Sequence, residues 1–165
     1  MRSSRRLLLT LLLVLAAGTA SLTRGAQKDK PKFEMSEDEK TLLDWTNKER
    51  AKEKLPPLEP NPLLFKMARE HSANMAKKGA MNHILDGKGP VERAKAAGYE
   101  YLNLAENVAT AENTPLTDVM KGWMESKIHR ENILNKDVTE IGLGIARTDK
   151  GVYYYTQVFG RPRKK

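Results

Sequence analysis

Cysteine is absent from this 165-residue chain, which excludes disulfide bonds, thiol catalysis and thiolate metal ligands. For the same reason, no cysteine is present to carry a lipid anchor. Internal repeats and low-complexity tracts are missing as well. A folded domain of this sequence is therefore stabilised by its hydrophobic core alone. The span 36–160 is long enough for one compact domain and hardly for two.

The chain also lacks a hydrophobic run that would span a membrane. The longest run, Leu7–Ala17, is shorter than the ~20 apolar residues that a transmembrane helix needs. Three arginines precede it and small residues follow at 18–20, which is the layout of a secretory signal peptide, with a membrane anchor as the alternative. We expect residues 1–20 to be a signal peptide cleaved after Ala20 and residues 21–35 to be a flexible lead-in. The mature protein is then secreted, either extracellular or periplasmic, with no transmembrane segment.

An excess of positive charge is missing from the expected domain, although the whole chain has a net charge of +8. Residues 35–160 contain 18 lysines and arginines against 19 aspartates and glutamates, a net charge of −1, with the two signs interspersed. Recognition of nucleic acid needs a basic patch, so we expect no nucleic-acid partner. Much of the remaining positive charge lies in a basic tail at 161–165, which we interpret as solvated. Contact of this tail with an anionic envelope polymer is the alternative.

Helix start and stop signals dominate the first half of the domain. Ser36 followed by Glu39 is a capping box, and Asn61 followed by Pro62 is a cap with proline in the first turn. Proline or glycine ends each periodic segment. The sequence therefore predicts helices over 36–54, 61–79 and 90–98, with a glycine-containing loop over 81–89.

Strand patterns dominate the second half. The predicted elements are a strand at 99–104, a loop at 110–114, a helix capped by Thr114, and a hairpin of strands at 140–147 and 152–159. In the first hairpin strand, Gly142 and Gly144 alternate with large apolar residues, so we expect their face to lie close beneath another layer. Helices first and strands last predict an α+β layered domain.

The segment 122–134, GWMESKIHRENIL, combines core residues with residues that carry chemistry. We expect its apolar residues to anchor it in the core: Trp123, Met124, Ile128, Ile133 and Leu134. If the helix continues to His129, then Glu125 and Ser126 share the side of the helix that carries the imidazole. One short element would then hold a carboxylate, a hydroxyl and an imidazole together.

Other polar candidates lie far from this segment in the sequence. His71 falls on the apolar stripe of the second helix, and we interpret it as a core histidine bonded to the backbone. His83 lies in the loop, from which a side chain is readily aimed at a pocket. Glu106 is flanked by small and apolar residues, an unusual setting for a carboxylate that faces water. Three further residues are expected to satisfy buried polar groups: Asn47, Arg50 and Asn107.

Five stretches of the chain follow one another in a characteristic order. They are LLDWTNKERAKEKLPPL, AREHSANMA with MNH, LAENVA, GWMESKIHRENIL with TEIGLGIA, and YYYTQVF. In this order and spacing they resemble the CAP superfamily, also called the SCP-like extracellular domain, and most of all its short bacterial branch without disulfides. The resemblance covers residues 40–160 and supports a CAP/SCP-like domain over 36–160. It implies a three-layer α-β-α sandwich with a central antiparallel sheet and an open cleft.

The resemblance also implies which residues line that cleft, because two histidines and two acidic residues commonly do so in the family. By motif position, His83 and His129 are similar to the histidines and Glu106 to the first acid. Ser126 occupies the second acidic position here, and Glu125 lies one residue earlier, about 100° away around a helix. The candidate cleft residues are therefore His83, Glu106, His129, Glu125 and Ser126.

The favoured function is that of a secreted binding or interaction module, which we expect to be a monomer. Its cleft would take a small ligand, a lipid, a cell-envelope component or a divalent metal. His83 and His129, with Glu106, are the candidate metal ligands, and Zn²⁺ is the candidate ion because such a set leaves a position open for water. An alternative without any ligand is that these three residues form a buried hydrogen-bonded cluster that joins the layers.

A hydrolase that uses the same cleft is the alternative function. It would be metal-dependent, or serine-type with Ser126 or Ser72 as nucleophile and His129 or His71 as base. Neither serine lies in a nucleophile elbow. An enzyme is therefore less favoured than a binding module.

Overall fold

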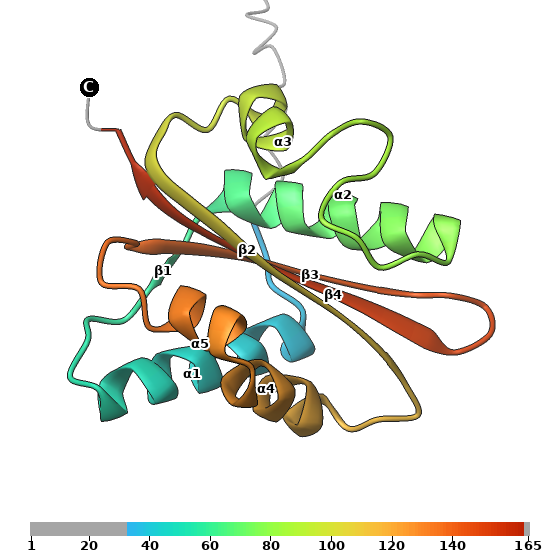
Figure 1. The fold of residues 1–165 in the computed structure, drawn as a ribbon, viewed down its shortest axis with the longest axis horizontal. Helices are drawn as coiled ribbons and strands as arrows, with labels where there is room; N and C mark the ends of the chain where they lie inside the picture. Colours follow the sequence, from blue (N-terminus) through green and yellow to red (C-terminus); the bar gives the residue numbers. More distant parts are fainter. Residues whose placement is uncertain (1–32, 164–165) are drawn as a thin grey trace, which may run out of the picture. The chain divides into compact units, whose positions relative to one another are not determined.

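A computed structural model describes residues 33–163, which form a β-sheet between two layers of helices (Figure 1). In chain order the elements are α1 (Glu37–Lys52), β1 (Glu59–Pro60), α2 (Pro62–Lys78), α3 (Pro90–Ala97), β2 (Tyr101–Glu112), α4 (Leu116–Glu125), α5 (Lys127–Ile133), β3 (Glu140–Arg147) and β4 (Val152–Pro162). The predicted α-β-α sandwich is confirmed. The expected signal peptide, the lead-in up to residue 32 and the last two residues of the tail lie outside the described residues. No helix within 33–163 has both the length and the apolar character that crossing a membrane takes.

The sheet has four strands in the order β1-β3-β4-β2. β4 pairs antiparallel with both of its neighbours, β2 and β3, as the predicted sheet requires. β1 is different, because it runs parallel to β3 and is held by the N–H groups of Glu59 and Asn61, which donate to Thr139 and Ile141 carbonyls. A two-residue strand in a proline-rich stretch shows no alternation, so the sequence patterns did not predict it.

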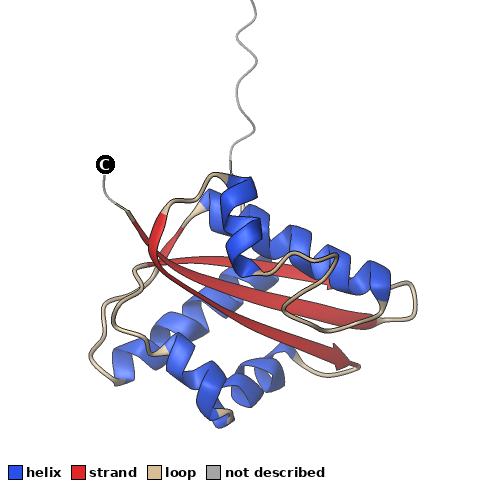
Figure 2. Ribbon diagram, turned by 45° about the horizontal axis from the view of Figure 1, so that its top comes forward, coloured by secondary structure: helices blue, strands red, loops and turns tan. Residues whose placement is uncertain are grey.

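Helices cover both faces of the sheet: α2 and α3 lie on one face, and α1, α4 and α5 lie on the other (Figures 1 and 2). The core on the α2 face includes Leu64, Met67, Ala68, Ala94, Tyr99 and Val158. The larger core includes Leu42, Phe65, Trp123, Ile133, Ile141 and Phe159. Hydrophobic clusters on both faces of a shared sheet, including a third one of Met75, Val108 and Tyr154, account for a stable domain without covalent cross-links.

Two of the predicted helix starts have the predicted capping hydrogen bonds. The Ser36 hydroxyl accepts from the Glu39 N–H at 3.2 Å, and the Glu39 carboxylate accepts from the Ser36 N–H at 2.8 Å, which completes the capping box. The Asn61 side chain accepts from the first N–H groups of α2. The predicted cap of α4 is wrong, since Pro115 holds that position and the Thr114 hydroxyl donates to the Glu112 carbonyl instead.

Two glycines of β3 set the distance between the sheet and α2. A Cβ atom on Gly142 would lie 2.0 Å from the carbonyl carbon of Leu64, and one on Gly144 would lie 2.2 Å from that of Ala68. Neither distance is compatible with a side chain, so the helix backbone rests directly on the strand. The predicted close approach of this strand face to another layer is confirmed.

β2 is much longer than the strand predicted at 99–104. It continues through Glu106 and ends at Glu112, and it pairs with β4 over its whole length. Local patterns did not indicate this extension, because Glu106 and Asn107 are polar residues of low strand propensity that are nevertheless buried. The second hairpin strand also extends beyond its predicted end at 159 and reaches Pro162, within the predicted tail.

The segment 122–134 is not one helix. Ser126 has an extended backbone with ψ at 120°, so α4 ends before it and α5 begins after it. Trp123 and Ile133 are buried as predicted, whereas the prediction for Ile128 is wrong because this side chain is 71% exposed. The premise that a continuous helix aligns Glu125, Ser126 and His129 is therefore also wrong.

Candidate functional site

A buried carboxylate, Glu106 on β2, is the centre of a polar cluster between the sheet and the loop that follows α2. Its side chain is only 2% exposed. One carboxylate oxygen lies 2.6 Å from Nη2 of Arg93, and the other lies 2.9 Å from Nδ1 of His83 and 3.8 Å from Nε2 of His71. A carboxylate shielded from water to this degree is stable as an anion only with such partners.

Arg93 on α3 connects the loop to this carboxylate. While Nη2 pairs with Glu106, Nη1 donates to the backbone carbonyls of His83 at 3.0 Å and Lys88 at 2.9 Å. The guanidinium thus fixes both ends of the segment that carries His83. Sequence patterns did not single out Arg93, although the expectation of a shielded Glu106 already called for a cation nearby.

His71 has the role predicted for it, that of a core histidine bonded to the backbone. Its Nε2 atom lies 2.9 Å from the Asn82 carbonyl, to which it donates, and its side chain is almost completely buried. Burial lowers the pKa of His71 below its ordinary value, and the positive charges of Arg93 and His83 act in the same direction. The negative charge of Glu106 and the bond to Asn82 oppose this shift without reversing it.

The lowered pKa of His71 predicts a pH-dependent stability. In the unfolded chain a histidine takes up a proton near pH 6.5, whereas the folded protein resists protonation at this site. The unfolded state therefore binds more protons below about pH 6.5, so the free energy of unfolding is highest above that pH and falls as the pH drops, by at most about 1.4 kcal/mol per pH unit for one group. Urea unfolding between pH 7.5 and 5.5 measures this slope. His71→Gln, which keeps a donor for Asn82, is expected to flatten it.

An equal slope in wild type and His71→Gln would contradict this role of His71. His129 contributes in the same sense, because burial, and then the charge of His83, lower its pKa. The slope of the variant is therefore expected to be reduced and not abolished.

An amide network holds α5 against β2 and so places His129. Asn107 Nδ2 donates to the His129 carbonyl at 3.1 Å, and Asn132 Nδ2 donates to the Asn107 side-chain oxygen at 2.8 Å. Asn107 is completely buried and also bonds Gln157, which in turn reaches the hydroxyl of Thr46 on α1. The structural role predicted for Asn107 is confirmed.

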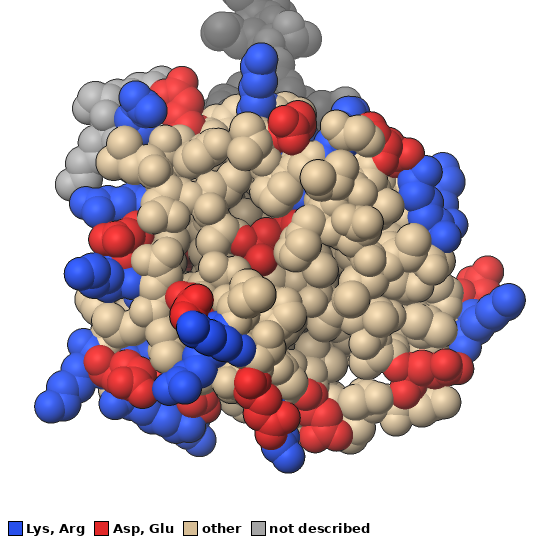
Figure 3. All heavy atoms as spheres, viewed as in Figure 1, with Lys and Arg blue, Asp and Glu red and all other residues tan. Residues whose placement is uncertain are grey.

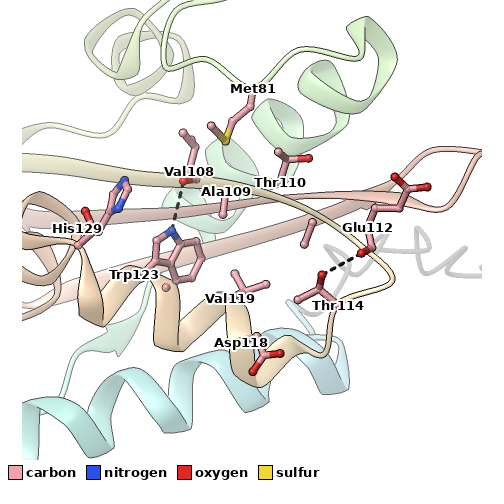
Figure 4. A pocket seen from close by; sticks show the side chains of 13 residues that line it. Met81, Val108, Ala109, Thr110, Glu112, Thr114, Asp118, Val119, Trp123 and His129 are labelled. Atoms are coloured by element: carbon pink, nitrogen blue, oxygen red, sulfur yellow. Dashed lines mark hydrogen bonds between the residues drawn. The ribbon is translucent and has the colours of Figure 1, made fainter.

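A pocket with a volume of about 530 Å³ lies along the outer edge of β2. Val108, Val119, Trp123 and Met81 form most of its apolar wall, and the Trp123 indole donates to the Val108 carbonyl at 3.3 Å (Figure 4). His129 lies at one end and Glu112 at the other. Met81 and Val119 were not predicted for the site, because nothing in their local sequence distinguishes them from core residues.

The structure distributes the predicted cleft residues over three places. His83 and Glu106 are bonded to each other, with the imidazole 48% exposed. Ser126 and His129 both line the 530 Å³ pocket, which His83 and Glu106 do not line. Glu125 belongs to a different groove, and its side chain is 67% exposed and 3.8 Å from Lys121.

The residues present do not fit the candidate zinc site. Within residues 33–163, no three histidine, aspartate or glutamate side chains are arranged to hold a metal ion. The carboxylate of Glu106 is engaged by the guanidinium of Arg93, whose positive charge opposes a cation at the same place.

The structure does not show the bonded pair of serine and histidine that a serine-type hydrolase would use. The Ser72 hydroxyl is completely buried and bonded to the Gly144 carbonyl and the Thr156 hydroxyl, so it has no access to a substrate. Ser126 and His129 share a pocket, but no hydrogen bond between their side chains exists in the part of the chain that the structure describes.

Comparisons with known proteins match most of this domain. The family model described as the cysteine-rich secretory protein family, CAP, matches residues 43–159. The uncharacterized protein YkwD of Bacillus subtilis is 37% identical over 124 residues, which are 74% of this chain and 47% of YkwD, so the chain spans less than half of that relative.

Solved structures give the same result. An outer surface protein of Borrelia burgdorferi superposes with a TM-score of 0.73 at 25% identity, over 79% of this chain and 97% of that one. An extracellular protein of Bacillus anthracis that contains an SCP domain has a TM-score of 0.68 at 27% identity, over 75% of this chain and 40% of that one.

Proposed function

The chain belongs to the cysteine-rich secretory protein (CAP) family, in a cysteine-free form with bacterial relatives, and from that premise we propose that it is an exported binding module. The proposed site is the pocket along the edge of β2, and the proposed ligand is small and largely apolar, such as a lipid or a component of the cell envelope. The observation that carries the proposal is the pocket itself, with an apolar wall that includes Trp123, Val119 and Met81.

The size and lining of the pocket support ligand binding. Its volume of about 530 Å³ lies within the range of roughly 300–1,000 Å³ that is typical of small-molecule sites. Trp123 and Val119 provide apolar area from α4, and His129 and Ser126 provide polar contacts that would orient a ligand. An apolar wall with polar groups beside it matches an amphiphilic ligand.

The surroundings of the site favour binding over catalysis. Both oxygens of the shielded Glu106 carboxylate are already engaged, one by Arg93 and the other by His83, so this carboxylate is not free to act on a substrate. Around the face drawn in Figure 3, acidic and basic side chains alternate at the margin, while uncharged atoms occupy most of the centre.

The proposed location outside the cytoplasm rests on the relatives and on the leader. The Borrelia burgdorferi protein is described as an outer surface protein, and the Bacillus anthracis protein as extracellular. The layout of residues 1–20 is that of a signal peptide.

Filling the pocket tests the proposal. Gly122 lines the pocket, and a Cβ atom added there meets nothing within 4 Å, so a leucine side chain would occupy the cavity without displacing the fold. The neutral probe N-phenyl-1-naphthylamine is expected to bind wild type with a rise in fluorescence. Gly122→Leu is expected to weaken this binding by at least about tenfold, equivalent to 1.4 kcal/mol.

Gly122→Ala is the matched control, since it changes the same position with little added volume, and its affinity is expected to stay within about twofold of wild type. A probe that does not bind wild type, or that binds Gly122→Leu equally well, would refute the pocket as the ligand site.

A further inference from the structure

β2 is the last strand of the sheet, and its outer edge forms one side of the pocket. No other strand pairs with this edge within residues 33–163. Five consecutive residues of the strand, 108–112, line the pocket. An edge of this length extends about 17 Å.

The direction of the backbone groups along β2 follows from the register of its partner. The Val152 carbonyl accepts a hydrogen bond from the Thr148 N–H, and the Gly160 carbonyl accepts one from the Thr139 N–H; both donors lie next to the ends of β3. The backbone N–H and C=O groups of the even-numbered residues of β4 therefore point toward β3, and those of the odd-numbered residues point toward β2. In the register of the β2–β4 pair, odd-numbered residues of β4 lie opposite odd-numbered residues of β2. The N–H and C=O groups of the even-numbered residues of β2 therefore point away from the sheet.

Between Glu106 and Glu112, side chains cap three of the four outward carbonyls, and the carbonyl of Thr110 is the exception. Asn132 donates to the Glu106 carbonyl, Trp123 to that of Val108, and Thr114 to that of Glu112. Between them, the outward N–H and C=O of Thr110 have no partner in the described part of the chain. They form an open donor–acceptor pair that faces the pocket.

The pocket lies in the plane of the sheet, between the two helical layers. Met81 borders it from the side of α2, and Val119 and Trp123 border it from α4 on the other side (Figure 4). An additional strand placed here would lie about 4.8 Å from β2, with alternate side chains directed toward Met81 and toward Trp123. We infer that the pocket takes an extended peptide segment that adds to β2 as a further strand and pairs with Thr110; this inference rests on the proposed function of the same pocket.

The charges of the lining define the peptide further. Glu112 and Asp118 contribute two carboxylates, and no lysine or arginine among residues 33–163 lines the pocket. Neither carboxylate forms an ion pair with another described residue. The ligand is therefore a peptide with apolar residues that face the walls and a basic residue that lies near Glu112 and Asp118.

A synthetic hexapeptide, acetyl-Val-Lys-Val-Thr-Val-Lys-amide, tests the inference. In an NMR titration of the ¹⁵N-labelled domain it is expected to bind with a Kd at or below about 1 mM and to protect the Thr110 amide from hydrogen exchange. The same peptide methylated on every backbone nitrogen is expected to bind at least about tenfold more weakly, because it cannot donate to the Thr110 carbonyl.

Thr110→Pro removes the outward N–H while the backbone bonds to β4 persist, since proline is tolerated where the missing N–H faces away from the sheet. Thr110→Pro and Thr110→Val both remove the hydroxyl that donates to the Tyr153 carbonyl at 3.1 Å, so this loss is matched between them. It is expected to weaken hexapeptide binding at least about tenfold, whereas Thr110→Val, which keeps the N–H, is expected to stay within about twofold. Asp118→Lys leaves the backbone pair unchanged and is expected to weaken binding about fivefold by charge reversal.

Binding of N-phenyl-1-naphthylamine separates this inference from the proposed function. If the probe binds wild type and Thr110→Pro equally but the hexapeptide does not bind wild type, strand addition is overturned and the pocket remains a small-ligand site. Equal affinity of the hexapeptide for wild type and Thr110→Pro overturns strand addition as well. If neither ligand binds wild type, both proposals fall.

Discussion

Replacing Gly142 with alanine is expected to lower the free energy of unfolding by more than about 4 kcal/mol. The added Cβ would lie 2.0 Å from the carbonyl carbon and 2.2 Å from the carbonyl oxygen of Leu64. These are atoms of the α2 backbone, which cannot rotate away as a side chain can. The helix would have to rise from the sheet and open the core that it shares with β3. Urea unfolding followed by circular dichroism measures the loss.

Gly122→Ala is the matched control for this substitution. Gly122 lies within α4, and a Cβ atom there meets no atom within 4 Å. Alanine is a better helix former than glycine, so this variant is expected to gain about 0.5–1 kcal/mol. If Gly142→Ala instead lost less than about 1 kcal/mol, α2 would not rest on β3 at the distance described here.

Arg50→Ala is expected to cost about 3–5 kcal/mol and to lower the melting temperature by on the order of 10 °C. Arg50 is only 1% exposed, and its guanidinium donates to the carbonyls of Pro56 at 2.9 Å, and of Ile133 and Asn135 at 2.8 Å. It thereby joins the end of α1 to the end of α5. Alanine would leave the carbonyls without donors and a cavity in place of the side chain. Burial lowers the pKa of Arg50.

Arg130→Ala serves as the comparison for Arg50→Ala in a thermal melt. Arg130 is an arginine of α5 whose half-exposed side chain lies 3.9 Å from an exposed Glu53 carboxylate. Its replacement is expected to change stability by less than about 0.5 kcal/mol. Similar losses in the two variants would show that the buried hydrogen bonds of Arg50 add nothing to stability.

Local signals in the sequence predicted the elements whose formation depends on local chemistry. The capping residues Ser36 and Asn61 marked helix starts because a side-chain acceptor meets N–H groups only two or three residues away. The alternation of Gly142 and Gly144 with large residues indicated a close layer, since only glycine permits such contact. These inferences need no knowledge of the distant parts of the chain.

The site was less predictable because its contacts are long-range. Arg93 and Glu106 are 13 residues apart and meet only because α3 and β2 pack side by side. The break at Ser126 has no glycine or proline to announce it, and it directs Glu125 away from the pocket that His129 lines. Family resemblance placed His83 next to Glu106 through the order of its motifs, and the structure brings these two residues into contact.

The capped carbonyls of β2 have a consequence for solubility. Two copies of a protein can pair along their edge strands when a continuous row of backbone N–H and C=O groups is free, and such pairing is a common start of aggregation. Here Asn132, Trp123 and Thr114 interrupt the row on both sides of Thr110. Within residues 106–112 only Thr110 keeps both its outward N–H and its outward C=O open, which disfavours pairing of two copies along this part of the edge.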